Sequence, residues 1–145
     1  MKENLSEITK YIQIARENHK KGNIYQANEI YKKLINQKIY TYELLISYGL
    51  FCKEINNLKI AKNLLILSIK KYPSKINSYI LLAEILRKEN KVNDALKTLH
   101  AAKKIENSNP DIDYNLSLSY KTIKSYIEAI SVSYTHLTLP TKLSV

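Results

Sequence analysis

Residues 76–99 read INSYILLAEILRKENKVNDALKTL, and this stretch decides the fold. Apolar residues recur in it at spacings of three and four, which is typical of a helix with one buried face. Leu82 and Ala83 belong to a first such stripe, and Ala95 and Leu99 belong to a second. Asn90 lies between the stripes, and asparagine accepts the left-handed conformation that ends many helices. The stretch therefore predicts two helices joined by a tight turn.

This hairpin pattern repeats along the chain with a period of 34 residues, the spacing between Ala27, Ala61, Ala95 and Ala129. Four other columns repeat with the alanines: a large apolar residue, a small residue, a turn residue, and a large residue in the second helix. In that order the columns hold Ile14, Tyr48, Leu82 and Leu116; Ala15, Gly49, Ala83 and Ser117; Gly22, Asn56, Asn90 and Lys124; and Tyr31, Leu65 and Leu99. Five columns with one period indicate an internal structural repeat.

The repeat predicts an all-α fold in which antiparallel helix hairpins stack into a solenoid. One hairpin cannot bury its apolar stripes alone, whereas stacking on the next hairpin does so. Only two glycines and three prolines interrupt the 145 residues, which favours long helices. We expect helices near residues 7–21 and 24–37, 42–55 and 58–71, 76–89 and 92–105, and 111–123, with a last one starting near residue 126.

The columns resemble those of the tetratricopeptide repeat (TPR), whose units carry a large residue, a large-small pair, an alanine, an aromatic residue and a closing proline. In this chain they read Tyr11, Ile14-Ala15, Ala27 and Tyr31; then Leu45, Tyr48-Gly49, Ala61, Leu65 and Pro73; then Tyr79, Leu82-Ala83, Ala95 and Leu99. The resemblance covers residues 8–130, as three full repeats (8–41, 42–75 and 76–109) and a truncated fourth (110–130). It departs from the family at Asn18, where an aromatic residue is usual, and at Asp113, which takes the first large position of the fourth unit.

Beyond Ile130 the repeat pattern stops. Residues 132–141, VSYTHLTLPT, contain no acidic residue and no helical stripe, and Pro140 together with three threonines works against a helix. The stretch from about residue 131 resembles a translated sequencing adapter. We therefore interpret residues 131–145 as a non-native tail and the repeat array as a fragment; the alternative is a genuine flexible C-terminus.

The chain carries a formal net charge of +10, from 23 basic and 13 acidic residues. Such a charge is compatible with acidic partners, nucleic acid or an anionic membrane. However, only Arg16 and Arg87 are arginines, the side chain best suited to bidentate phosphate and base contacts. We therefore interpret the charge as lysine on solvated helix faces, and nucleic-acid binding becomes the least favoured hypothesis. The N-terminus is polar and the apolar runs are short, which argues against a signal peptide and against a membrane-spanning segment. We therefore expect a cytoplasmic location.

No group of residues in the sequence indicates catalysis or a cofactor. Two isolated glycines cannot form a phosphate-binding loop, and His19, His100 and His136 have no second ligand at metal spacing. Cys52 falls in a core column, where a small buried hydrophobe is a better interpretation than a nucleophile. We therefore expect no enzyme activity, no cofactor and no metal.

The resemblance implies a concave groove, lined by the first helix of each unit, in which a partner would bind. Its columns place three rows of residues there: an apolar row (Ile12, Ile46, Ile80 and Tyr114), a mixed row (Arg16, Leu50, Glu84 and Leu118) and a basic row (His19, Lys53, Arg87 and Lys121). We hypothesise that an extended or helical peptide places apolar side chains on the isoleucines and acidic groups on Lys53, Arg87 and Lys121. The alternative is that the isoleucines pack against neighbouring helix pairs.

The sequence therefore predicts a module that binds a protein or peptide, and an acidic one if the basic row takes part. The family's clamp for a C-terminal carboxylate needs an asparagine at the position of Leu50, so we do not expect it to bind chaperone tails. The alternative function is the N-terminal substrate-docking region of a larger enzyme, such as a glycosyltransferase, sulfotransferase or oxygenase. The natural reading frame beyond Ile130 separates the two, because further repeats favour a scaffold and catalytic motifs favour an enzyme.

Overall fold

The computed structural model describes the backbone of residues 4–143 and the side chains of residues 4–135. Helices make up most of this part of the chain, which contains no strand. They are α1 (Leu5–Lys20), α2 (Ile24–Asn36), α3 (Tyr42–Glu54), α4 (Leu58–Lys71), α5 (Ile76–Lys88), α6 (Val92–Ile105) and α7 (Pro110–Leu143). The helix pairs predicted for the first three repeats are confirmed, with boundaries within two residues of those expected.

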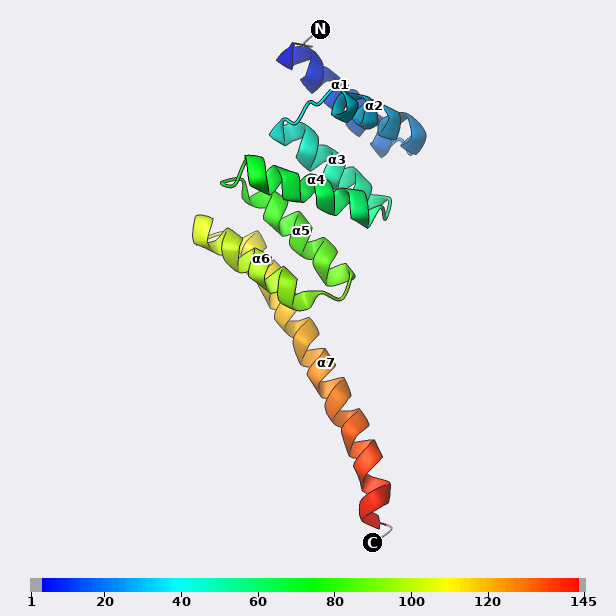
Figure 1. Ribbon diagram of the computed structural model, residues 1–145, viewed down its shortest axis with the longest axis vertical. Coiled ribbons are helices and arrows are strands. Elements are labelled where there is room, and N and C mark those ends of the chain that lie inside the picture. Colours follow the sequence, from blue (N-terminus) through cyan, green and yellow to red (C-terminus); the bar gives the residue numbers. More distant parts are fainter. Residues whose placement is uncertain (1–3, 144–145) are drawn as a thin grey trace.

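The helices pair as hairpins, α1 with α2, α3 with α4 and α5 with α6, and the hairpins stack on one another (Figure 1). The second helices α2, α4 and α6 form one layer, and the first helices α1, α3 and α5 form the layer behind it. The first part of α7 packs against α6 and α5, as α5 does against α4 and α3. The predicted fold class, an all-α solenoid of antiparallel helix hairpins, is confirmed.

Left-handed residues end the first helix of each hairpin. Gly22 has φ 81°, Asn56 has φ 63° and Asn90 has φ 61°. In each turn the next backbone N–H donates to a carbonyl five residues earlier, at 2.8 Å: Asn23 to Asn18, Asn57 to Cys52, and Lys91 to Leu86. These bonds satisfy carbonyls at the helix end that have no partner inside the helix. The turns predicted at these three positions of the turn column are confirmed.

Small residues let the two helices of a hairpin approach closely. The column alanines Ala27, Ala61 and Ala95 are fully buried. At Gly49 the fit is tighter still, because a Cβ built there would lie 3.0 Å from the Leu65 Cδ2 atom. The hydrophobic core is continuous between hairpins. It consists of two main clusters of buried residues, and Ile69 and Leu86 pack against both of them.

The fourth unit does not form the predicted hairpin. We expected a turn at Lys124 and a new helix near residue 126, but α7 runs without a break from Pro110 to Leu143 and projects away from the stack (Figure 1). The physical reason is local: residues 122–126 include no Gly, Asn or Pro, so nothing there favours the left-handed conformation that the other turns adopt.

The expectation that the sequence after residue 131 is not helical is also wrong for the described backbone. Hydroxyl side chains are accommodated in α7 by bonding back one turn, since Thr122 donates to the Leu118 carbonyl and Thr135 donates to the Ser131 carbonyl, both at 2.9 Å. Pro140 lies close to the end of α7, and the side chains of residues 136–143 and all of residues 144–145 lie outside the described part. The non-native origin of residues 131–145 stays a prediction. No helix in the described part is both long enough and apolar enough to cross a membrane.

Candidate functional site

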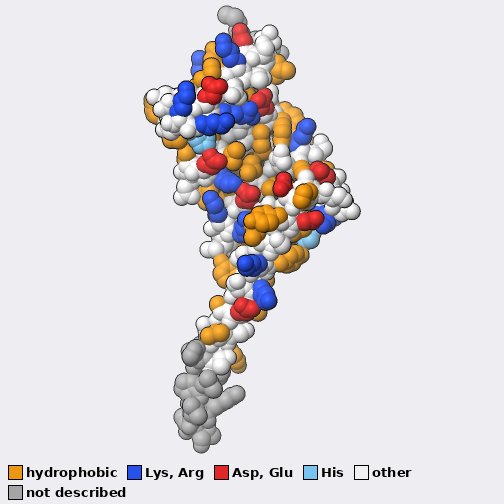
Figure 2. All heavy atoms as spheres, turned by 180° about the vertical axis from the view of Figure 1, so that it is seen from behind, with side chains coloured by type: hydrophobic (Ala, Val, Ile, Leu, Met, Phe, Trp, Pro, Cys, Tyr) orange, Lys and Arg blue, Asp and Glu red, His pale blue; other side chains and the backbone are white. Residues whose placement is uncertain are grey.

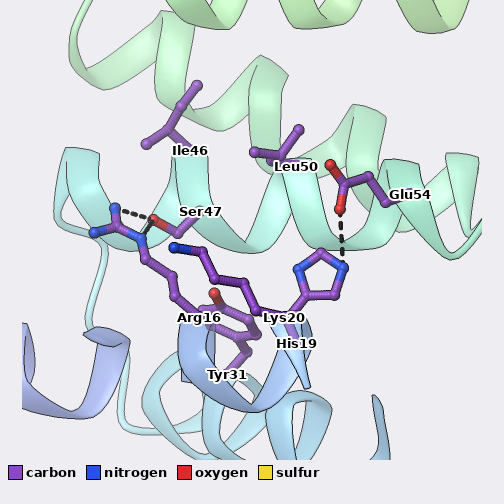
Figure 3. Close-up of a pocket in the computed structure, with 8 residues that line it drawn as sticks. All are labelled: Arg16, His19, Lys20, Tyr31, Ile46, Ser47, Leu50 and Glu54. Atoms are coloured by element: carbon purple, nitrogen blue, oxygen red, sulfur yellow. Dashed lines mark hydrogen bonds and ion pairs between the residues drawn. The ribbon is translucent and has the colours of Figure 1, made fainter. Parts of the chain in front are cut away.

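The first helices of the hairpins form one broad face of the stack. Apolar side chains gather along the middle of this face, among Lys, Arg, Asp and Glu side chains (Figure 2). Between α1 and α3 lies a pocket of about 370 Å³, which we call the α1–α3 pocket. Arg16, His19 and Lys20 of α1 line one side of it, and Ile46 and Leu50 of α3 line the other (Figure 3). The pocket thus combines an apolar wall with a basic one.

Arg16 is held at the pocket by bonds to α3. Its Nε and Nη2 atoms donate to the Ser47 hydroxyl at 3.1 and 2.6 Å (Figure 3). Its Nη1 atom lies 3.3 Å from the Glu43 carboxylate. Because these contacts come from the next repeat, they join the first two hairpins as well as orienting the guanidinium. Arginine has five N–H donors, so a further acceptor can still bind it.

His19 lines the same pocket and is oriented by two residues of α3. Its Nε2 atom lies 2.9 Å from a carboxylate oxygen of Glu54. Its ring meets the Phe51 ring edge to face, with centroids 5.0 Å apart. His19 is therefore part of the site that the basic row predicts, although an acidic partner from the same chain already engages it.

Tyr31, from α2, forms the floor of the pocket. Its ring is buried and stacks on the Tyr48 ring with centroids 5.0 Å apart, while its hydroxyl faces the pocket (Figure 3). Burial raises the pKa of Tyr31 to about 12, so the hydroxyl stays protonated at neutral pH and can donate a hydrogen bond. It has no hydrogen-bond partner among the described residues.

Lys20 supplies a further cation at the mouth of the pocket. The side chain is exposed and lines the same pocket as Tyr31 (Figure 3). Within the described part of the chain, no carboxylate lies within ion-pair distance of its ammonium. An ammonium with no internal partner can bind an anionic ligand without first breaking a contact within the protein.

Lys53 and Arg87 of the basic row do not share this freedom. The Lys53 ammonium donates to the Glu84 carboxylate, from α3 to α5, and Arg87 Nη1 lies 3.4 Å from Asn115 Oδ1, from α5 to α7. Lys121 is exposed on α7. The structure therefore places Lys53 and Arg87 in bridges between successive repeats, where they stabilise the stack.

The apolar row is only partly accessible. Ile12 is fully buried and Ile80 is 8% exposed, whereas Ile46 is half-buried and Tyr114 is 62% exposed. For Ile12 and Ile80, packing against neighbouring helices is thus the interpretation that agrees with the structure. An exposed strip of all four residues does not form, because α1 and α5 turn this column toward the core.

Lys20 and Tyr31 were not among the site residues that sequence reasoning selected. Tyr31 falls in a core column beside Leu65 and Leu99, which suggests packing alone, and the column of Lys20 continues with Glu54, Lys88 and Thr122. The sequence signal for these two residues was a change of residue type within each column. In the first repeat the leucine column holds a tyrosine, which carries a hydroxyl, and the mixed column holds a lysine.

We expect stability to fall at alkaline pH, because the aromatic core under the pocket holds buried acidic groups. Burial raises the pKa of Tyr31 and Tyr48 from 10.0 to about 12, and that of the Cys52 thiol from 9.0 to about 12. Between pH 9 and 12 the unfolded chain therefore loses these protons while the folded chain keeps them. These three groups leave the free energy of unfolding unchanged below this window and lower it as the pH rises through it. Urea unfolding at successive pH values measures the decrease, and Tyr31→Phe should make it shallower; an equally steep fall in that variant would contradict the assignment.

No protein-family model matches the sequence, and no curated protein matches it. Solved structures do match. The Hsp90 co-chaperone Cns1 from Saccharomyces cerevisiae has a TM-score of 0.80 at 16% identity, over 97% of this chain and 47% of that one. The first TPR of Spaghetti (RPAP3), bound to the HSP90 peptide SRMEEVD, has a TM-score of 0.74 at 14% identity, over 83% of this chain and 96% of that one.

A third match is a mutant O-GlcNAc transferase from Thermobaculum terrenum, with a TM-score of 0.70 at 18% identity, over 82% of this chain and 23% of that one. At identities this low the matches describe the fold. Together with the hairpin geometry, they show that the chain is a helix-hairpin solenoid of the TPR type.

Proposed function

We propose that this protein is an interaction module that binds a peptide segment of a partner protein along the face formed by α1, α3, α5 and α7. The observation that carries the proposal is the α1–α3 pocket, in which aliphatic and basic side chains from two repeats meet. Peptide-binding surfaces commonly combine apolar contacts with charged groups around them. The likeness to a TPR domain bound to an HSP90 peptide supports a peptide as the ligand class.

The accessible apolar residues favour an extended or helical segment over a small molecule. Leu50 and Tyr114 are exposed on α3 and α7, and Ile46 and Leu118 are half-buried on the same two helices. These residues lie on the second and fourth repeats rather than closing around one cavity. A chain that follows the face could bury them in turn, which is the geometry of groove recognition.

The proposal is tested by mapping where a peptide binds. A peptide selected from a random library against the whole chain would be titrated into isotopically labelled protein, and backbone amide shifts would be recorded. We expect the largest shifts at Arg16, Lys20 and Leu50, and none at Ile66, an exposed residue of α4 in the opposite layer. Shifts concentrated on α2, α4 and α6 would refute the proposal.

A second proposal is that the repeats dock substrates for a larger enzyme. Its support is the likeness to the O-GlcNAc transferase, of which this chain spans 23%. The natural gene beyond the codon of Ile130 decides between the two proposals, since a downstream catalytic domain supports docking and further repeats support a scaffold.

A further inference from the structure

Basic side chains on the binding face differ in whether a carboxylate of the same chain already contacts them. Arg16 contacts Glu43, His19 contacts Glu54 and Lys53 contacts Glu84. Lys20 has no such partner among the described residues, and it lines the α1–α3 pocket together with Tyr31, whose hydroxyl has no hydrogen-bond partner there either. Two hydrogen-bond donors without internal acceptors therefore occupy one end of the binding face.

The pairing is specific to the first junction between repeats. One repeat later, the position of Lys20 holds Glu54 and that of Tyr31 holds Leu65. In the third repeat the positions hold Lys88 and Leu99, so a lysine recurs there without the hydroxyl. The α1–α3 pocket brings an ammonium without an ion-pair partner and a hydroxyl donor together over an aliphatic wall.

This inference rests on the proposed function. We infer that the α1–α3 pocket binds one acidic side chain of the bound peptide, a Glu or Asp that lies next to an aliphatic residue. The carboxylate accepts from the Lys20 ammonium and the Tyr31 hydroxyl, with the edge of the Arg16 guanidinium as a further donor. The neighbouring aliphatic side chain packs on Ile46 and Leu50. Charge-assisted hydrogen bonds of this kind are short and about twice as strong as neutral ones.

The chemistry favours an internal acidic side chain over a chain terminus. A terminal residue presents its backbone N–H as well as its carboxylate, and an amide side chain is suited to hold both because it donates and accepts hydrogen bonds. The lining of this pocket includes no Asn or Gln. The site also sets register, because the acidic residue lies at the first repeat and the accessible apolar residues of α3 and α7 lie beyond it.

The test is a selection from a phage library that displays random peptides inside a loop, so that no free terminus is offered. The targets are the wild-type chain, Lys20→Met, and the matched control Lys88→Met, an exposed lysine at the equivalent position of the third repeat. We expect wild type and Lys88→Met to enrich an acidic residue beside an aliphatic one. Lys20→Met should keep the aliphatic preference and lose the acidic one.

A selected peptide, acetylated and amidated, then gives the coupling directly. Its affinity should fall about tenfold for Lys20→Met, and about tenfold when its acidic residue is changed to the amide. Both changes together should cost little more than one, because they remove the same contact. Tyr31→Phe should weaken binding less, and raised salt should weaken binding to the wild type more than to Lys20→Met.

Three outcomes would overturn the inference: acidic enrichment that survives Lys20→Met, equal losses in Lys20→Met and Lys88→Met, or binding only of peptides with a free C-terminal carboxylate. Failure of the proposed function looks different. In that case no peptide binds, or binding is insensitive to a charge placed on the apolar wall of the pocket.

Discussion

Replacing Phe51 by Ala should lower the free energy of unfolding by about 3–5 kcal/mol, the range found when a large aromatic side chain is removed from a core. Phe51 is fully buried on α3 and contacts the rings of His19, Tyr31 and Tyr48, with centroids 5.0, 5.4 and 6.2 Å away. Since Tyr31 and His19 belong to the first hairpin, the substitution also weakens the contact between two repeats. In a stack of repeats, stability is the sum of unit and interface contributions, and both are affected here.

Urea unfolding followed by circular dichroism measures this loss. Phe51→Leu, which keeps most of the volume, should cost less than about 1.5 kcal/mol. Tyr25→Ala is the surface control: Tyr25 is 72% exposed, and its removal should change stability by no more than about 0.5 kcal/mol. A loss from Phe51→Ala as small as the one from Tyr25→Ala would show that the aromatic cluster does not hold the first two hairpins together.

The second large effect is expected on binding, from Leu50→Asp. Leu50 lies on the apolar wall of the α1–α3 pocket and is 38% exposed, so the folded chain tolerates a polar side chain there. The change removes an aliphatic contact and places a negative charge beside the proposed position of the ligand's carboxylate. Loss of one central contact typically costs about 2 kcal/mol, which corresponds to ~30-fold in affinity, and repulsion between the two carboxylates adds to it.

Titration of a labelled selected peptide into wild type, Leu50→Asp and Ile66→Asp measures the effect. Ile66 is a matched control, an aliphatic residue of α4 with 48% exposure on the other layer of the stack. Ile66→Asp should bind like wild type, and both variants should unfold at nearly the wild-type urea concentration. Equal affinities of the two variants would place the peptide elsewhere on the molecule.

The hairpins were predictable from sequence because each of them depends on local chemistry. Asn56 and Asn90 lie where a left-handed residue must end a helix, and the buried alanines lie where two helices approach closely. The turn predicted at Lys124 does not form, because Lys124 matches the column position but lysine does not favour a turn. Period alone therefore predicts where a turn fits, and residue chemistry decides whether it forms.

The candidate site was only partly predictable. The column pattern predicted His19 and Ile46, which line the pocket, together with Lys53 and Arg87, which bridge successive repeats instead. It missed Lys20 and Tyr31. The sequence by itself determined the helices, their pairing and the order of the stack, because periodic apolar stripes and turn residues act within one repeat. Only the tertiary structure decided which cations remain unpaired, because that depends on which side chain of the next hairpin lies within reach.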